Sequence, residues 1–500
     1  MSCYHLGRIF SLAGGLRQHA PGVTLHSTMG RTIIDKLWDE HAVADLGDAS
    51  TLLYIDRIFL HERTGSVALK GLEAAGRKVR NPEHVFCTMD HIVDTTPGRN
   101  DDTRMPGGRD FILSTRASAR AAGITLFDLG DDRQGIVHVV SPEQGIALPG
   151  VTLVCPDSHT CTLGGLGALA WGIGSTEGEH ALATKTLAVR KPKRMRIRFE
   201  GRPGPRIYAK DLILHVINRF GSSGGAGYAI EFAGSVIRAL PVEARLTLCN
   251  MAVEFGAWTG IVAPDELTFE YVRGRPYAPR TAEWDRAVAH WRTLDSDADA
   301  EFDRELAVDC SSLAPQVTWG TSPQQGGGID AVVPDPAAET DANRRQSAER
   351  ALQYMGLTPG TPLAGLPIGA AFIGSCTNSR LSDLREAAAI LRGRHVASGV
   401  RAICVPGSSL VKKAAEAEGL DQVFRDAGFE WRESGCSMCF YAGGESFGLE
   451  ERVITSTNRN FENRQGPRTR SHLASPASVA ASAIAGAITD VRQLPVTGHG

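Results

Sequence analysis

The 500-residue sequence predicts an α/β protein of about three domains. Segments rich in β-branched and apolar residues alternate with segments of helical spacing through the first half of the chain, and this alternation resumes from residue 370. The 55 glycines are spread along the chain, which suits α/β turns and close backbone packing better than disorder.

The elements follow in order along the chain. A helix is expected over residues 32–41, because Ile33, Ile34, Leu37 and Trp38 recur at helical spacing. The alternation then predicts strands at 52–60, 85–89, 124–129 and 151–155, with helices at 64–75 and 109–122. After a helix at 207–219, the pattern resumes with strands at 371–374 and 402–405 and helices at 381–391 and near 412–417.

Two polar stretches suggest the domain boundaries. Residues 191–198 are basic and contain a proline, which favours a solvated linker and an edge strand, and residues 295–303 are acidic. We therefore divide the chain into domains at 32–192, 193–295 and 296–492, with a tail at 493–500.

Residues 1–31 form an extension before the first domain. The first 34 residues contain no Asp or Glu but include Arg8, Arg17 and Arg31, a weak likeness to an organellar transit peptide. The preferred interpretation is a disordered extension or an upstream start codon, with Met29 beginning the folded part. We expect a cytoplasmic protein, or an organellar one if this extension is a transit peptide.

Composition excludes some classes of function. The 53 basic and 56 acidic residues give a net charge of −3, which argues against an extended nucleic-acid footprint. The sequence contains no stretch of about 18 apolar residues of the kind that spans a membrane. The segment Gly165-Leu166-Gly167-Ala168 resembles a dinucleotide fingerprint, but it follows a polar loop, so we interpret it as tight helix packing.

Three of the ten cysteines stand out. Cys376 lies in a loop between a strand and a helix, and Cys436 and Cys439 form a C-x-x-C pair. A structural zinc site needs four ligands, and no second pair supplies them. A redox dithiol would belong near the start of a small thioredoxin-like domain. Three thiolates could instead bind a [4Fe–4S] cluster with one iron free for substrate, although zinc, redox and core cysteines stay open.

Other polar residues surround these motifs in the predicted fold. Arg459 and Arg464 follow the C-x-x-C pair, and guanidinium groups suit carboxylates. Asp90-His91 and Asp157-Ser158-His159 each follow a predicted strand, where open α/β sheets place their sites. An aspartate beside a histidine can orient the ring and raise its basicity, which would make a poised acid or hydrogen-bond donor.

At this point long segments resemble a known family. They include YIDRIFLHE, TMDHIVDT, QGIVHVVSPEQG, DSHTCTLGGLGALAWGIGSTEGEHALAT, LTLCNMAVEFGA, PQVTWGT, FIGSCTNSR, GFEWRESGCSMC and TNRNFENRQG. These motifs resemble the large subunits of isopropylmalate isomerase, which belong to the aconitase superfamily. The resemblance runs from about residue 32 to about residue 491.

The resemblance implies a three-domain aconitase-type core with an iron–sulfur cluster between domains and with the swivelling fourth domain absent. It implies one [4Fe–4S] cluster per chain on Cys376, Cys436 and Cys439, with Asn378 and Asn458 as adjacent amides. The other implied site residues are the acid–base and hydrogen-bonding residues Asp90, His91, Asp157, His159 and Glu231, and the substrate-binding residues His61, Ser158, Arg459 and Arg464.

The implied activity is that of a hydro-lyase of leucine biosynthesis. It would interconvert 2-isopropylmalate and 3-isopropylmalate by dehydration and rehydration, with His159 or His91 as the acid for the leaving hydroxyl. In the superfamily the proton-abstracting base is a serine on the swivelling domain, so a small subunit is the implied partner. The alternatives are the same chemistry on homoaconitate or another alkylmalate, and a non-catalytic iron-sensing homologue.

Some residues depart from the family pattern beside the implied site. Pro156 and Asn463 stand where Gly is usual, Cys161 replaces a small residue, and residues 440–445 differ from the usual run. These departures leave the implied ligands intact.

Overall fold

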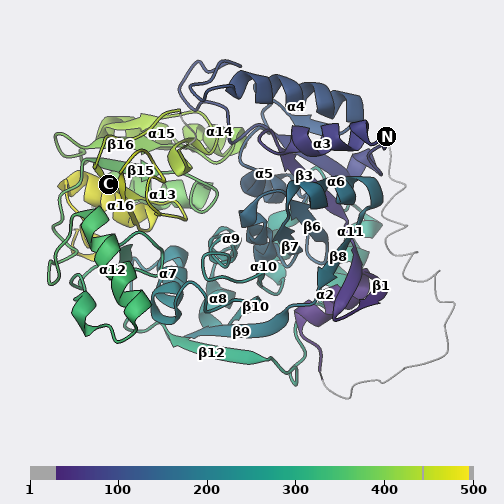
Figure 1. Cartoon of the computed structure of the whole chain (residues 1–500), viewed down its shortest axis with the longest axis horizontal. Coiled ribbons are helices and arrows are strands. Elements are labelled where there is room, and N and C mark those ends of the chain that lie inside the picture. The colour runs from purple at the N-terminus through teal and green to yellow at the C-terminus, as the bar shows by residue number, and fades with distance from the viewer. Residues whose placement is uncertain (1–29, 442–443, 495–500) are drawn as a thin grey trace.

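Parallel β-sheets form the frame of the computed structural model, which describes residues 30–441 and 444–494 (Figure 1). The expectations for residues 1–29, including a transit peptide, and for most of the 493–500 tail lie outside the described residues. Within the described residues, the α/β class is confirmed, with three parallel sheets and two small antiparallel ones.

The first parallel sheet contains five strands. Their order is β5-β4-β3-β6-β7, from Thr125–Phe127, Val85–Thr88, Arg57–His61, Thr152–Cys155 and Leu169–Gly172. The chain adds β4 and β5 on one side of β3 and β6 and β7 on the other. The order therefore reverses between β3 and β6, and such a reversal leaves a crevice at the carboxyl ends of the strands.

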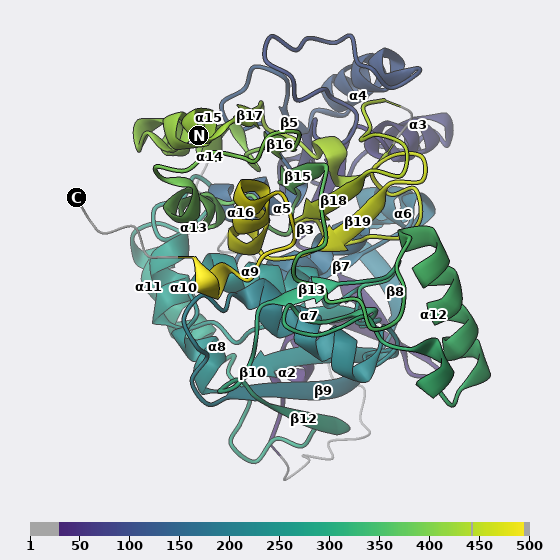
Figure 2. The ribbon, with the colours of Figure 1, turned by 90° about the vertical axis from the view of Figure 1, so that its left-hand side faces the viewer.

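The sheet near the C-terminus repeats this topology. Its order is β17-β16-β15-β18-β19, from Phe429–Trp431, Arg401–Cys404, Ala370–Ile373, Arg452–Thr455 and Arg470–Leu473. Its reversal lies between β15 and β18, which Figure 2 shows above the middle of the view. The loop with Cys376 follows β15, and the loop with Arg459 follows β18.

The middle sheet has the order β11-β10-β9-β12, from Thr259–Ile261, Tyr228–Ala233, Lys193–Glu200 and Arg304–Asp309. The expectation that residues 191–198 form a linker and an edge strand is wrong, because β9 pairs on both sides. Its basic side chains lie on a solvated face, where Arg196 pairs with Glu305 on β12. This sheet also extends beyond residue 295, where the sequence suggested a change of domain.

The remaining strands form β1-β2-β8 (Ala42–Gly47, Ser50–Tyr54, Thr186–Arg190) and β13-β14 (Gln316–Thr318, Gly326–Gly328). The helices up to the middle sheet are α2 (Ile33–His41), α3 (Gly65–Ala74), α4 (Gly108–Ala122), α5 (Val137–Gln144), α6 (Ser175–Thr184), α7 (Ala209–Phe220), α8 (Ser235–Ala239), α9 (Val242–Asn250), α10 (Glu266–Val272) and α11 (Ala282–Trp291). The later helices are α12 (Ala342–Met355), α13 (Leu381–Leu391), α14 (Ser409–Ala417), α15 (Leu420–Ala427) and α16 (Pro476–Ala485), and short 3₁₀ helices include η2 (Ser158–Leu166) and η4 (Ser437–Cys439).

Local sequence explains how several helices begin and end. Thr32 and Asp35 form a capping box at the start of α2, and Ser408 caps α14. Gly123 ends α4 with φ of 68°, a conformation that glycine adopts without steric cost. These signals lie in the printed sequence, and the predicted helices at 32–41, 109–122 and 381–391 are confirmed within one residue at each end.

Each parallel sheet has its own apolar core of buried side chains. The glycine-rich segment after Asp157 packs between the first and middle sheets, as the interpretation of tight packing requires. A Cβ atom on Gly164 would lie 1.9 Å from the carbonyl oxygen of Gly260, and one on Gly165 would lie 2.7 Å from the backbone nitrogen of Leu246. Among the described residues, no helix has the length and apolarity to cross a membrane.

Candidate active site

The carboxyl ends of the first and last sheets meet at one place. Main-chain bonds join the two, since Cys436 N donates to Asp90 O at 2.8 Å and Ile136 N donates to Gly407 O at 2.8 Å. The hydroxyl of Thr95 also donates to that of Ser437 at 2.8 Å. The loops that follow the strands of both sheets therefore surround a common space.

The three predicted cysteine ligands lie in this space. The side chains of Cys376, Cys436 and Cys439 are buried, and none forms a disulfide. Burial and the nearby Cys439 and Asp157 raise the pKa of the Cys376 thiol well above its ordinary value. A bound metal would deprotonate such thiols.

The donor set fits an iron–sulfur cluster. Asn250 Nδ2 lies 3.2 Å and Asn458 Nδ2 lies 3.5 Å from Cys376 Sγ, and Arg464 Nη2 lies 3.7 Å from Cys439 Sγ. Hydrogen bonds to sulfur are a recurring feature of such clusters.

The predicted pair of Asp90 and His91 forms at the end of β4. Nδ1 of His91 donates to Asp90 Oδ1 at 2.6 Å, and both side chains are largely buried. Burial alone would lower the pKa of His91, but the charges of Asp90 and Cys436 and the hydrogen bond with Asp157 raise it well above its ordinary value. His91 is thus held between two carboxylates, those of Asp90 and Asp157.

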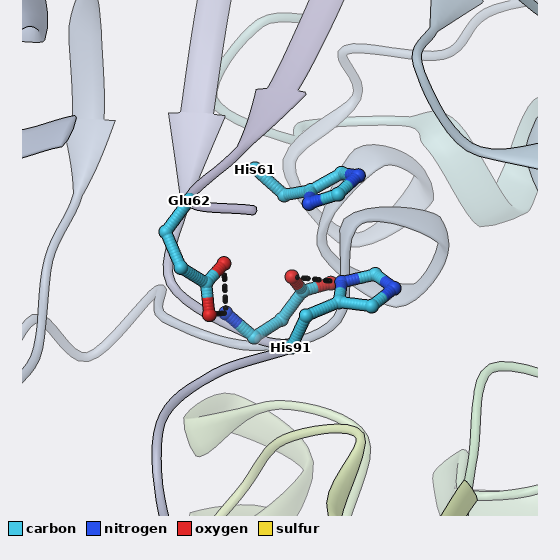
Figure 3. A group of neighbouring side chains, drawn as sticks. His61, Glu62 and His91 are labelled. Atoms are coloured by element: carbon cyan, nitrogen blue, oxygen red, sulfur yellow. Dashed lines mark hydrogen bonds and ion pairs between the residues drawn. The ribbon is translucent and has the colours of Figure 1, made fainter. Parts of the chain in front are cut away.

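His61 lies at the end of β3, against His91. Their rings stack with centroids 4.2 Å apart, as Figure 3 shows. The adjacent Glu62 accepts backbone N–H groups of Asp90 at 3.0 Å and Ile92 at 2.5 Å. Burial, followed by the charge of Asp90, raises the pKa of Glu62 to about 7. Glu62 therefore fixes the loop that carries the Asp90–His91 pair.

In the second predicted pair, the side chains of Asp157 and His159 bond to other residues and not to each other. Asp157 caps η2 by accepting from the backbone N–H of His159 at 2.7 Å, while the nearest ring nitrogen of His159 is 3.8 Å away. The carboxylate of Asp157 instead accepts from His138 Nε2 at 2.9 Å and lies 3.3 Å from His91 Nε2. Nε2 of His159 donates to Glu254 at 2.9 Å.

The two predicted arginines enter the site from the loop after β18. Arg459 Nε donates to Glu254 at 2.7 Å and its Nη2 donates to Ser158 Oγ at 3.1 Å. Arg464 lies over the ring of Phe461, 5.1 Å from its centroid, and over that of Phe440. Ser158 and Arg459, both of them predicted substrate-binding residues, are thus in contact.

Several buried polar atoms around this space have no hydrogen-bond partner in the described residues. They include His61 Nδ1, His138 Nδ1, Glu254 Oε2, Asn458 Oδ1 and Arg464 Nε. A buried polar atom without a partner costs about 1–3 kcal/mol, so such a concentration indicates a site for a polar ligand.

Two predicted site residues, Glu231 and Asn378, have their hydrogen-bond partners outside the cysteine site. Glu231 is on β10, where it accepts from Ser296 Oγ at 2.5 Å, and burial raises its pKa to about 7. Its printed hydrogen bond among the described residues is with Ser296 and not with a cysteine, whereas the buried Glu254 contacts His159 and Arg459 at the site. Asn378 donates to Asp383 at 2.8 Å, so Asn250, not Asn378, pairs with Asn458 at Cys376.

No motif in the sequence indicates three further site residues, Glu254, His138 and Asn250. All three lie in segments that carry the family resemblance, QGIVHVVSPEQG and LTLCNMAVEFGA. None is adjacent in sequence to another polar site residue, so no pair of neighbouring Asp and His residues marks them.

Comparisons with known proteins show the family to which this chain belongs. The profile of the aconitase family, described as Aconitase family (aconitate hydratase), matches residues 35–486. The 3-isopropylmalate dehydratase large subunit 1 of Bradyrhizobium diazoefficiens is 54% identical over 473 residues, which cover 95% of this chain and 99% of that protein. This chain belongs to the aconitase family.

A solved structure, holo aconitase X of Thermococcus kodakaraensis, is 13% identical with a TM-score of 0.43, and the match covers 86% of this chain and 89% of that one.

The sequence departures near the site of this aconitase-family chain have local explanations. Asn463 has φ of 65°, a left-handed conformation that Asn tolerates better than most residues. Cys161 is buried, and its thiol donates to the carbonyl of Asn250 at 3.5 Å. Glu445, at the end of the segment that departs from the family pattern, accepts from Arg432 and Arg401 and is thereby bound to the last sheet.

Proposed function

We propose that this chain is the large subunit of a two-subunit hydro-lyase that interconverts 2-isopropylmalate and 3-isopropylmalate in leucine biosynthesis. The observation that carries the proposal is the 54% identity, over nearly the full length of both chains, to a 3-isopropylmalate dehydratase large subunit. The site geometry supports it, because thiols, guanidinium groups and histidine–carboxylate pairs converge on one space.

The proposed cofactor is one [4Fe–4S] cluster on Cys376, Cys436 and Cys439. When bound, it would supply a Lewis acid for the hydroxyl group that leaves and returns. The amides of Asn250 and Asn458 would donate hydrogen bonds to the sulfur of Cys376, as they do in this structure. Such bonds stabilise the thiolate and set the properties of the cluster.

The two arginines are the proposed anchors for the substrate carboxylates. Guanidinium groups bind carboxylates through parallel hydrogen bonds. Glu254 and Ser158 fix Arg459 through its Nε and one Nη, so its orientation is set before substrate binds. Arg464 is oriented by two aromatic rings, and its Nε lacks a partner in the described residues.

His91 is the proposed acid. Its Nδ1 lies 2.6 Å from Asp90 and its Nε2 lies 3.3 Å from Asp157. A ring between two carboxylates is favoured in its protonated form, so it can donate a proton to the departing hydroxyl and take one back from water during rehydration. Nε2 of His159 donates to Glu254, so we assign His159 to the orientation of the substrate and not to proton transfer.

The proposed partner is a small subunit that supplies the base for the carbon-bound proton. A cytoplasmic location, or import into an organelle through residues 1–31, belongs to the same proposal. The test is an anaerobic assay of the purified chain with and without the small subunit on 2-isopropylmalate, homoaconitate and citrate. We expect turnover of 2-isopropylmalate when both subunits are present and none by this chain without the small subunit. Turnover by the isolated chain would overturn the two-subunit part, and a cluster-loaded pair that turns over none of these acids would support a non-catalytic homologue.

A further inference from the structure

A cavity of about 360 Å³ opens beside Ser158 and Asp157. Its walls are mostly apolar and come from segments far apart in the sequence. Five side chains supply that apolar surface, those of Pro156, Ile173, Val253, Ala257 and Trp258. Asp157, Ser158 and Gly172 complete the lining.

The apolar wall is already rigid in this structure. The ring of Trp258 packs against that of Trp171 with centroids 4.9 Å apart, and its backbone N–H donates to Tyr228 O at 2.8 Å. Ile173 N donates to Cys155 O at 3.0 Å, which fixes the backbone of another residue of the wall. A Cβ atom on Gly172 would lie 2.5 Å from the carbonyl oxygen of Asp157, so the close approach of these two segments requires glycine there.

The cavity adjoins the proposed carboxylate anchors. Ser158 lines the cavity and also accepts from Arg459 Nη2 at 3.1 Å. Val253 lines it from the residue before Glu254, which accepts from Arg459 Nε. A small acid whose carboxylate binds Arg459 therefore has this cavity within reach of its other substituents.

Charge decides which substituent fits. The only charged residue in the lining is Asp157, and its carboxylate is engaged by His138 and His91. A carboxylate that entered would lose its hydration beside a like charge and find no cation in the lining. An alkyl group, in contrast, gains by leaving water for an apolar surface.

We infer that this cavity binds the uncharged alkyl branch of a 2-alkylmalate substrate, and so selects against a third carboxylate. The inference rests on the proposed function and deepens it, because the cavity assigns alkyl selection to this subunit and disfavours homoaconitate as the substrate. A hydrophobic pocket discriminates about 10- to 200-fold per methylene group, which sets the size of the expected effect.

The test compares kcat/KM for 2-isopropylmalate and 2-methylmalate in the complete enzyme with its small subunit. Val253→Phe fills the cavity, so we expect the ratio of the two values to fall about tenfold or more. The matched control is Val332→Phe, at a side chain that is 53% exposed and lies outside the cavity lining, which leaves the ratio unchanged. Equal loss of both activities in Val253→Phe would overturn the inference.

A second variant tests the inference independently if Val253→Phe does not fold. Ile173→Ala enlarges the cavity, so we expect a relative gain for a 2-alkylmalate with one more methylene group than 2-isopropylmalate. No change in relative activity would overturn the inference. A wild-type enzyme that turns over homoaconitate or citrate but not 2-isopropylmalate would instead overturn the proposed function, which keeps the two failures distinct.

Discussion

Glu254 accepts a hydrogen bond from His159 across 95 residues of sequence, with its Oε1 2.9 Å from Nε2 of the ring. The same oxygen accepts from Arg459 Nε at 2.7 Å. Burial raises the pKa of Glu254, but the charges and hydrogen bonds of His159 and Arg459 outweigh it and lower that pKa below its ordinary value. One buried carboxylate thus orients a ring from the first sheet and a guanidinium group from the last.

Glu254→Gln should lower kcat/KM for 2-isopropylmalate about 10- to 100-fold, the usual cost of losing a residue that orients a ligand-binding group. The amide keeps the shape of the side chain but removes the charge that both donors face. Steady-state kinetics of the complete enzyme measures the effect. Glu231→Gln is the matched control, since Glu231 is a buried glutamate bonded to Ser296, and it should leave kcat/KM within about twofold. Equal losses in the two variants would contradict the assignment.

Cys376→Ser should abolish cluster binding, because a hydroxyl replaces a thiolate that receives two amide hydrogen bonds. Iron and sulfide analysis of anaerobically reconstituted protein should fall to background, and the visible absorption of the cluster should disappear. Cys404→Ala serves as control, since Cys404 is a buried residue of β16. Full iron content in Cys376→Ser would exclude Cys376 as a ligand.

Arg464→Lys should raise KM about 10- to 100-fold, the equivalent of about 1.5–3 kcal/mol for a hydrogen bond to a charged group, with a smaller change in kcat. The lysine keeps the charge but cannot form two parallel hydrogen bonds with a carboxylate. Arg468→Lys, at a side chain that is 63% exposed, should behave as wild type. A wild-type KM for Arg464→Lys would show that Arg464 binds no substrate carboxylate.

The buried pair of His41 and Asp56 should make stability depend on pH. Their side chains lie 2.8 Å apart, between the end of α2 and the residues before β3. Burial opposes ionisation, but His41 lowers the pKa of Asp56 to about 2. Burial would likewise lower the pKa of His41, but Asp56 raises it above 6.5. The Asp56 shift corresponds to about 2 kcal/mol.

The directions of these two pKa shifts define the pH range in which the pair stabilises the fold. The lowered pKa of Asp56 stabilises the fold above about pH 4, and this contribution is lost as pH falls toward 2. The raised pKa of His41 stabilises it below 6.5, and this contribution is lost as pH rises through the raised value. His41→Gln should therefore cost about 2 kcal/mol near pH 5 and less near pH 9, measured by urea unfolding. The exposed control His395→Gln should show no such difference, and equal costs of His41→Gln at both pH values would contradict the pairing.

The sequence predicted those features that depend on neighbouring residues. Helical and strand periodicities placed most elements, and Asp90 pairs with the residue next to it because the loop after β4 leaves both side chains in the crevice. Closeness in sequence did not predict the partners of Asp157 and His159 in the same way. There the chain turns at once into η2, and the carboxylate is used to cap that turn and to accept from His138.

The remaining errors involve contacts between distant segments. Glu254 is 205 residues from Arg459, and Asn250 is 126 residues from Cys376, so only packing of the sheets brings them together. Glu231 was placed at the site by resemblance alone, but the pairing of β10 with β9 and β11 sets it beside Ser296. The charges of residues 191–198 predict a linker and an edge strand, but alternate residues of β9 are buried and the strand is paired on both sides.

The main-chain bonds between the first and last sheets have a consequence for how substrates come and go. Hinged enzymes open where few backbone bonds cross, but here Cys436 N bonds Asp90 O and Ile136 N bonds Gly407 O on the rim of the crevice. These bonds oppose separation of the two sheets, so opening between them is an unfavourable route for a doubly charged substrate. In a two-subunit enzyme, the rates of substrate entry and product release would then be set by how often the partner lifts away.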